Sequence, residues 1–547
     1  MPRLRPPFPP SQLRAQLTFL RHRCVASTST ATPTPSPTGS GPTIFAPATA
    51  RGKAAISILR ISGPEALTVW HQCTEPPHLK APGKRSSSHN PPERKAVLRK
   101  ILHPQSREVL DHGIVIYFPA HSALTSQPTL ELHTHGSPAL LQLLIDVLPT
   151  LSRSFRIAEP GEFTRLAFES GKMDLTEVEG IRDLVDAHTE SQRTLAARQA
   201  NGQTRKVYEG MRAQIIESTA LVEALIDFGE DEGISEDVFE QARDKVKQLR
   251  DRIAQSLADG RRGEIIRSGI QLAIIGAPNA GKSSLLNWLG GNLSRSVSQR
   301  GLLKLMRVLE SAFTAQREAA IVASTPGTTR DIVELSLDYH GFPITVADTA
   351  GLRKTHDEVE GIGIARALQK ARAADVKLCV LSLPAILESG DKAIIDPLTL
   401  NLIDASTIVV LNKVDALRAT EPQLAYVRSA LASTSWGSRS TKTLWQVSLK
   451  TRDGLRELGD GLKEVLKDRF DLPEDADDIP LVTHARHRHH LQECHISLET
   501  FLSLEAEDIV SAAEELRYAV FALSKISGAI DTEEILGQIF SGFCIGK

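Results

Sequence analysis

The string Gly276-Ala-Pro-Asn-Ala-Gly-Lys-Ser283 has the residue types and spacing of a phosphate-binding loop, G-x-x-x-x-G-K-[ST]. We predict a strand before it and a helix after it, which is the setting this motif requires. Backbone N–H groups of such a loop cradle phosphates, Lys282 reaches the β- and γ-phosphates, and Ser283 ligates Mg²⁺. A glycine-rich turn without a ligand is the alternative, and this setting argues against it. The candidate ligand-binding residues here are Asn279, Ala280, Gly281, Lys282, Ser283 and Ser284.

Three further motifs follow in order and select the nucleotide. Asp348-Thr-Ala-Gly351 comes after a predicted strand and supplies an Asp on the metal side and a Gly that senses the γ-phosphate. Asp415 of Asn412-Lys-Val-Asp415 can accept two N–H bonds from guanine, a donor pair that adenine lacks, so the sequence predicts GTP. Ser448-Leu-Lys450 stands where a loop, called here the base-side loop, would pack on the base. The candidate residues of the three motifs are Asp348, Thr349, Ala350, Gly351, Asn412, Lys413, Asp415, Ser448, Leu449 and Lys450.

The mechanism of hydrolysis can be read partly from a missing residue. Leu352 follows the Asp-Thr-Ala-Gly string, where regulatory GTPases of the Ras type carry the Gln that orients water. In Gly327-Thr-Thr-Arg-Asp331, the presumed switch I, Thr329 is predicted to ligate Mg²⁺. We hypothesise that Asn279 and carbonyls ahead of Thr328 hold a monovalent cation that replaces an arginine finger.

The rest of the chain, which must position these residues, divides into regions of three sequence types. Residues 43–168 are short β-rich runs between Gly/Pro/Ser breaks, typical of a small α/β domain. Residues 175–267 have apolar residues at helical spacing, and helical sequence returns after Pro473. Between them, predicted buried strands at 271–275, 344–347, 376–381 and 407–411 alternate with helices. The predicted fold class is therefore α/β and α, with a doubly wound P-loop domain inserted in a discontinuous helical domain.

Composition limits the partners and the compartment. The 547 residues carry a net charge of −2, so RNA would have to be held by local patches. The five cysteines are scattered without a C-x-x-C pair, which favours a reducing compartment. No run of 18 apolar residues occurs, and we expect no stable membrane insertion.

The first acidic residue is Glu65, while the opening stretch is rich in Arg, Ser, Thr and Pro. Residues 12–24 can form a short basic amphipathic helix, and we predict residues 1–41 to be a mitochondrial transit peptide leading to the matrix. A disordered extension without an address is the alternative.

Several strings outside the nucleotide motifs carry a resemblance to a known family. They are Ile58-Leu-Arg-Ile-Ser-Gly63, Leu130-Glu-Leu-His-Thr-His-Gly136, Ala158-Glu-Pro-Gly-Glu-Phe-Thr-Arg-Leu-Ala-Phe168 and the ending Phe543-Cys-Ile-Gly-Lys547. The nucleotide motifs alone are shared by TrmE-like and Era-like GTPases. With these flanks, residues 43–547 resemble the TrmE/MnmE family of tRNA-modification GTPases.

The resemblance implies a potassium-dependent GTPase that modifies C5 of wobble uridine U34 in mitochondrial tRNA together with a GidA-type FAD protein. It also implies a homodimer formed through the N-terminal domains, a 5-formyl-tetrahydrofolate-type one-carbon donor, and an aminomethyl-type product. The family positions map, at the folate, to Arg60, Glu131 and Lys172, with Lys547 also among the cofactor-binding residues. Potassium maps to Asn279, Ala323, Thr325 and Thr328, Mg²⁺ to Ser283 and Thr329, and catalysis to Lys282, Glu360 and Cys544.

Ordinary alternatives remain for two of these assignments. Arg60, Glu131 and Lys172 can form common structural ion pairs. Cys544 is either a thiolate that adds to uridine C6 or a buried cysteine on a terminal helix. In addition, Ala123-Leu-Thr-Ser-Gln-Pro128 departs from the family's pattern beside the folate position.

The predicted domains begin with the transit peptide at 1–41 and a folate-binding and dimerisation domain at 42–168. The helical domain is predicted in two segments, at 169–267 and at 471–547, and the G domain lies between them at 268–470. An atypical insertion at 290–316 is either a surface loop, which we would expect to be mobile and to displace switch I, or a retained intron.

Three features of the sequence allow alternative interpretations. The segment with His484, His487, His489, His490 and Cys494 is predicted to be a solvated helix face able to touch tRNA, with a metal site as the alternative. The alternative function is a GTP-switched mitochondrial ribosome-assembly factor. A folate-binding module with a decayed G domain is disfavoured by the intact Lys282, Asp348 and Asp415.

Overall fold

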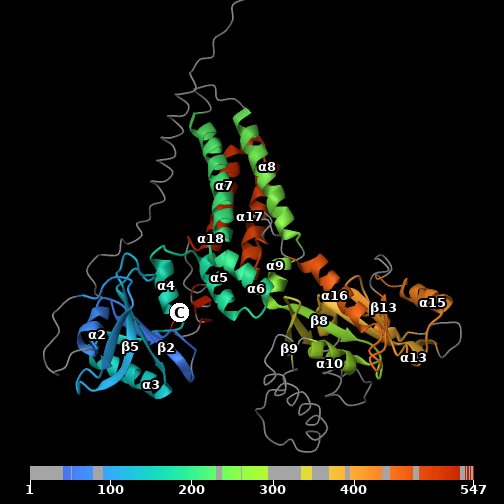
Figure 1. Ribbon diagram of the computed structural model, residues 1–547. Helices are drawn as coiled ribbons and strands as arrows, with labels where there is room; N and C mark the ends of the chain where they lie inside the picture. The colour runs from blue at the N-terminus through green and yellow to red at the C-terminus, as the bar shows by residue number, and fades with distance from the viewer. Residues whose placement is uncertain are drawn as a thin grey trace, which may run out of the picture. The chain divides into compact units, whose positions relative to one another are not determined.

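The structure is a computed structural model (Figure 1). It describes residues 41–50, 52–77, 90–228, 237–259, 261–292, 334–347, 369–387, 395–432, 434, 436, 444–471, 480–529, 536, 539, 540, 542, 543 and 546. The chain divides into two units. The first comprises Met1–Arg182, Gln199–Ile253 and His490–Lys547, and the second comprises Asp183–Arg198 and Ala254–His489.

The first unit begins with a seven-stranded sheet in the order β3-β4-β5-β6-β2-β1-β7. Its strands are β1 (Thr43–Pro47), β2 (Ala54–Ser62), β3 (Thr74–Glu75), β4 (Val97–Leu102), β5 (Val109–Phe118), β6 (Thr129–Gly136) and β7 (Phe155–Ile157). All neighbours pair antiparallel except β1 and β7. The helices that accompany this sheet are α2 (Ala66–Cys73), α3 (Pro138–Val147), η1 (Leu148–Thr150) and α4 (Glu162–Glu169). Alternate strand residues such as Leu59, Val115 and Leu132 pack with α2 and α3 to form its core.

Helices complete the first unit, and some of them continue across its boundary. They are α5 (Leu175–Asp186), α6 (Glu190–Ala200), α7 (Gln203–Phe228), α8 (Asp237–Leu257), α17 (Ala485–Ser503), η6 (Ala506–Asp508) and α18 (Ile509–Ser527). α7 and α18 lie side by side, although about 300 residues separate them in the chain (Figure 1). The helical domain is therefore discontinuous in sequence, as predicted.

The second unit is built on a six-stranded sheet in the order β13-β12-β11-β8-β10-β9. Its strands are β8 (Ile270–Ile275), β9 (Glu334–Tyr339), β10 (Phe342–Ala347), β11 (Val376–Ser382), β12 (Thr407–Asn412) and β13 (Leu444–Val447). All pairs are parallel except β9 with β10. Its helices include α9 (Arg262–Ser268), α10 (Lys282–Asn292), α13 (Leu383–Leu387), α14 (Pro397–Leu400), α15 (Glu421–Ala432) and α16 (Leu455–Phe470).

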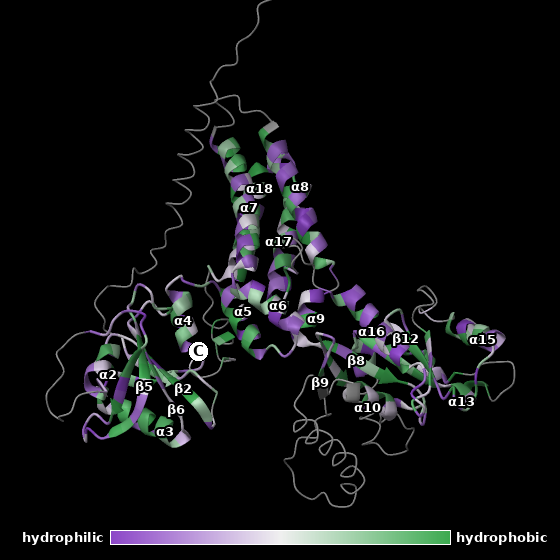
Figure 2. Cartoon of the chain, in the orientation of Figure 1, coloured by the Kyte–Doolittle hydropathy of each residue, from purple (hydrophilic) through white to green (hydrophobic). Residues whose placement is uncertain are grey.

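Two apolar cores cover the two faces of this parallel sheet. α10 and α16 pack with Leu272, Ile274 and Val346 in one core, whereas α13 and α15 pack with the other face in the second. β11 and β12 are buried along their whole length, as expected for parallel strands covered on both faces, and the central strands of the sheet are mostly hydrophobic (Figure 2). The predicted doubly wound domain, inserted between helical segments, is confirmed.

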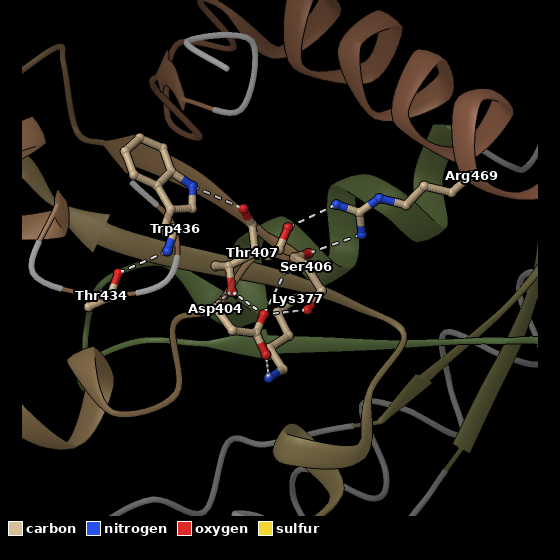
Figure 3. A network of polar contacts seen from close by, with 8 residues as sticks. Lys377, Asp404, Ser406, Thr407, Thr434, Trp436 and Arg469 are labelled. Atoms are coloured by element: carbon tan, nitrogen blue, oxygen red, sulfur yellow. Dashed lines mark hydrogen bonds and ion pairs between the residues drawn. The ribbon is translucent and has the colours of Figure 1, made fainter. Parts of the chain in front are cut away.

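A polar network closes the amino ends of β11 and β12 (Figure 3). Lys377 is 3% exposed, and its Nζ donates to Asp404 Oδ2 at 2.5 Å. Burial acts to raise the pKa of Asp404, but hydrogen bonds from Lys377 and Ser406 hold it below its ordinary value. Arg469 donates to the carbonyls of Ala405 and Ser406. Because this edge is opposite the carboxyl ends of the parallel strands, we assign the network a structural role.

The predicted solvated histidine face is wrong for three of its five residues, whereas His489 is exposed. His487 and Cys494 are fully buried and His490 is 6% exposed. These positions continue the buried stripe of Leu491, Leu498 and Phe501 at helical spacing. The apolar residues that follow therefore decide which face of α17 is buried, and His487 and His490 lie on that face.

Asp174 caps the start of α5 with a buried carboxyl group. Its Oδ1 accepts from Glu177 N and Thr176 Oγ1, both at 2.8 Å, and its own N donates to Glu177 Oε2. The side chain is 8% exposed, and Oδ2 has no hydrogen-bond partner among the described residues. Burial is the largest effect and raises the pKa of Asp174 to about 6. The cap is therefore formed at the cost of burying an ionisable group.

This arrangement predicts a pH-dependent cost to folding. Since the folded-state pKa of Asp174 is raised, the folded state loses stability as pH rises from the unfolded-state value of 3.8 through about 6. In Asp174→Asn the cap acceptor is kept and the ionisation removed. We expect the parent to lose about 1 kcal/mol relative to this variant between about pH 5 and pH 8. Urea unfolding at both pH values measures it, and a difference between the two proteins that does not change with pH would contradict it.

Candidate nucleotide-binding site

The P-loop lies between β8 and α10, as the motif requires. Gly276 has φ 141°, and a Cβ there would overlap the carbonyl oxygen of Val380 on the neighbouring strand. Gly281 has φ 111°, and its Cβ would overlap Asn412 Nδ2. Both glycines are therefore required by close packing as well as by backbone conformation. Ser283 and Ser284 follow in the first turn of α10.

Lys282 is held by the loop that precedes it. Its Nζ donates to the carbonyl oxygens of Gly276 at 2.8 Å and Ala277 at 3.0 Å. Asn279 adopts φ 62°, a left-handed conformation that Asn tolerates better than most residues. These contacts wrap the loop around the Lys282 side chain. The wrapped loop leaves room for a phosphate group at the N-terminus of α10.

Asn412, at the end of β12, joins the P-loop to the base-side loop. Its Nδ2 donates to Ala280 O at 2.7 Å, and its Oδ1 accepts from Leu449 N at 3.1 Å. The side chain is 3% exposed. Lys413 follows with φ 72°, which turns the chain at the edge of the sheet. One amide group thus fixes two predicted motifs against each other.

Asp415 is exposed at the same edge and is oriented by Ser448. Ser448 Oγ donates to Asp415 Oδ1 at 2.7 Å, and Ser448 itself is fully buried. This hydrogen bond is the main reason that the pKa of Asp415 lies below its ordinary value, with smaller contributions from Lys450 and Lys413. The carboxylate is therefore ionised at neutral pH and can accept donors from a base.

The structure thus brings together the P-loop, Asn412 to Asp415 and Ser448 to Lys450 at the carboxyl edge of the sheet, where doubly wound folds bind ligands. The remaining predicted nucleotide and cation residues lie outside the described residues. They are Ala323, Thr325, Thr328, Thr329, Asp348, Thr349, Ala350, Gly351 and Glu360. All but the first three residues of the 290–316 insertion lie outside them too.

In the first unit, two of the three predicted folate residues meet on neighbouring strands. Arg60 Nε donates to Glu131 Oε1 at 3.0 Å, and the Arg60 guanidinium lies over the Phe163 ring at 5.7 Å. Lys172 Nζ donates instead to Ala123 O, in the loop that departs from the family pattern. That loop is anchored by Thr125, whose hydroxyl lies 2.7 Å from that of Ser62.

His133 is a candidate residue that the sequence analysis missed. Its Nε2 is buried, lies 3.4 Å from Glu131 Oε2, and makes no hydrogen bond among the described residues. Its position two residues after Glu131 on β6, on the same face of the strand, was the available signal. A buried ring nitrogen that makes no hydrogen bond and lies beside the Glu131 carboxylate fits a site that accepts a polar ligand.

The C-terminal segment packs within the same unit. Cys544 and Lys547 lie outside the described residues, but their neighbours Phe543 and Gly546 are described. Phe543 belongs to an apolar cluster with Leu175, and a Cβ at Gly546 would overlap the carbonyl oxygen of Pro47. Gly546 has φ 101°, so glycine is required there by both space and conformation.

A doubly wound sheet whose first strand enters a P-loop, with an Asn-Lys-x-Asp string at its carboxyl edge, defines a P-loop GTPase. The description "MnmE helical domain" matches residues 175–544, and "GTP-binding protein TrmE N-terminus" matches residues 43–172. The chain belongs to the MnmE/TrmE family.

Curated relatives cover the chain almost completely. The tRNA modification GTPase MnmE of Parvibaculum lavamentivorans is 39% identical over 92% of this chain and 100% of that protein. The mitochondrial 5-taurinomethyluridine-[tRNA] synthase subunit GTPB3 of Danio rerio is 38% identical over 92% of this chain and 93% of its own length. The mitochondrial tRNA modification GTPase gtpbp3 of Dictyostelium discoideum is 34% identical over 92% and 95%. Bacterial and mitochondrial relatives are thus about equally similar.

Proposed function

We propose that this chain is a potassium-dependent GTPase that, with a GidA-type FAD protein, modifies C5 of wobble uridine U34 in mitochondrial tRNAs with an aminomethyl-type group. GTP hydrolysis in tRNA modification is what the relatives' names state, and the P-loop architecture agrees with it. The structural observation that supports the GTPase element of the proposal is the double contact of Asn412 with Ala280 and Leu449, which holds the phosphate and base loops together. In this proposal Ser283 and Thr329 ligate Mg²⁺, Lys282 contacts the phosphates, and Glu360 acts on the attacking water.

The N-terminal domain is proposed to bind a 5-formyl-tetrahydrofolate-type donor and to form the homodimer. Arg60 and Glu131 supply a cation for the ligand's carboxylates and an acceptor for the pterin's amino edge. The same sheet face carries a cross-strand row in which Leu98 pairs with Ile114 and Ile114 with His133. Leu98 is 55% exposed and Ile114 is 41% exposed. An apolar open face of this kind supports association of two copies.

The proposed compartment is the mitochondrial matrix, with residues 1–41 as the transit peptide. Two eukaryotic relatives are named as mitochondrial, which supports this assignment. No helix among the described residues is both long and apolar enough to span a bilayer. Cys544, at the C-terminal segment, is proposed to take part in the uridine chemistry.

Potassium dependence is tested on residues 43–547 by GTP turnover in KCl, NaCl and choline chloride at equal ionic strength. A cation at the phosphates replaces an arginine finger, so we expect turnover roughly 10- to 100-fold faster in KCl. In Asn279→Gly, which removes the amide but keeps the φ of 62° accessible, the potassium stimulation should disappear.

The matched control is Ala277→Gly, which adds a glycine to the same loop and leaves the Asn279 amide in place. This variant should keep the potassium stimulation. Equal rates in potassium and sodium for the parent protein would end the potassium element of the proposal. A lost response in both variants would assign the effect to loop flexibility instead of Asn279.

A further inference from the structure

The turn between β9 and β10 contacts the first turn of α6 within the second unit. The carbonyl oxygen of Gly341 accepts from Ser191 Oγ at 2.7 Å and from Ser191 N at 3.2 Å. α6 begins at Glu190, so the N–H of Ser191 is one of those that a helix cannot pair internally. The β9–β10 turn therefore supplies an acceptor that the helix start needs.

The turn itself is firmly constrained. His340 has φ 52° and Gly341 has φ 93°, and Gly341 N donates to Asp338 Oδ1 at 2.8 Å. Tyr339 is 3% exposed, and its hydroxyl donates to Gly459 O on α16 at 3.0 Å. A turn held at both ends in this way moves with its strands and not independently of them.

A second link from the same helix turn reaches α9. Gln192 Nε2 donates to Arg267 O at 3.1 Å, while its Oε1 accepts from His188 N at 3.0 Å. Arg267 lies in the last turn of α9, and its Nε donates to Asp183 Oδ2 at 2.8 Å. Neighbouring residues of α6 thus hold the β9–β10 turn and the end of α9.

Both elements lead directly to phosphate motifs in the sequence. β9 begins at Glu334, three residues after the Gly327-Thr-Thr-Arg-Asp331 string, and β10 ends at Ala347, immediately before Asp348. α9 ends at Ser268, just before β8 and the P-loop. The first turn of α6 is therefore hydrogen-bonded to the hairpin that joins the Gly327–Asp331 and Asp348–Gly351 motifs in the sequence, and to the segment that enters the P-loop.

We infer that Ser191 and Gln192 are positioning residues that carry the nucleotide state of the G domain into the helical domain through α6. The inference rests on the proposed GTPase function. α6 is one continuous helix that starts in the second unit, and its last residues, Gln199 and Ala200, belong to the first. If the β9–β10 hairpin is displaced, the carbonyl oxygen of Gly341 moves with it. The hydrogen bonds that this oxygen accepts from Ser191 at the start of α6 then change.

The test compares full-length parent and Ser191→Ala/Gln192→Ala proteins by hydrogen exchange in GDP and in a non-hydrolysable GTP analogue. In the parent, peptides covering the first turn of α6 should differ between the two nucleotides. In the double variant that difference should be lost, while the P-loop peptide still responds and nucleotide affinity stays within about twofold. Thr194→Ala removes a hydroxyl on the same helix that faces Glu190 instead, and it should behave as the parent.

A second readout separates coupling from mere helix capping. With GTP turnover within about twofold of the parent, the double variant should yield roughly five- to thirtyfold less modified uridine for each GTP hydrolysed. An α6 that does not respond to nucleotide in the parent, or an unchanged yield per GTP in the double variant, would overturn the inference. Absence of modified uridine with the parent protein would instead count against the proposed function, and the exchange measurement would still decide the coupling.

Discussion

Lys282→Ala is expected to reduce kcat/KM for GTP by about 10³-fold. In the structure the ammonium group already lies inside the curled loop, bonded to Gly276 O and Ala277 O. When a nucleotide enters, this charge faces the β- and γ-phosphates, where negative charge develops during transfer. Alanine removes both the loop contacts and the charge.

Lys467→Ala on α16 is the matched control, since Lys467 is an exposed lysine of the same unit that pairs with Asp471 at 3.9 Å. It should hydrolyse GTP like the parent. Steady-state turnover with thermal unfolding of both variants separates catalysis from folding. Turnover by Lys282→Ala within tenfold of the parent would mean that the P-loop is not the catalytic site.

Much of the fold followed from the sequence because its signals are local. Apolar runs such as 271–275 and 407–411 predicted buried parallel strands, and those runs are β8 and β12. The Gly and Lys positions of the P-loop were predictable for the same reason, since loop conformation and phosphate chemistry both restrict residue type. These features depend on residues within a few positions of one another.

Features that depend on tertiary contacts could not be predicted in this way. The burial of His487 on α17 depends on the neighbouring helices, and the polar sequence around it indicated solvent. Ser191 and Gly341 are 150 residues apart, and neither belongs to a recognisable motif. His133 could not be predicted as a site residue, because its role depends on tertiary contacts that leave its Nε2 buried and without a hydrogen bond.

Asp415→Asn is expected to lower the preference for GTP by about 10²- to 10³-fold and to make xanthosine triphosphate a better substrate. Guanine offers N–H donors at N1 and at its 2-amino group, and the carboxylate of Asp415 accepts both. An Asn amide has one acceptor and one donor group. Xanthine has a carbonyl at position 2 in place of the amino group, so the Asn NH₂ can donate to it. With guanine, the same NH₂ would face the 2-amino group, and two donors would oppose each other.

Ser448→Ala is the control that separates base recognition from the orientation of the side chain. It removes the 2.7 Å hydrogen bond that fixes Asp415 Oδ1 but leaves the carboxylate, so both nucleotides should weaken while guanine remains preferred. Turnover of GTP and xanthosine triphosphate in competition measures the ratio directly. If Asp415→Asn still prefers GTP, residues other than Asp415 recognise the base. If Asp415→Asn turns over xanthosine triphosphate in preference to GTP, the base binds at the carboxyl end of β12. Asn412 then holds that end of the strand against the phosphate loop.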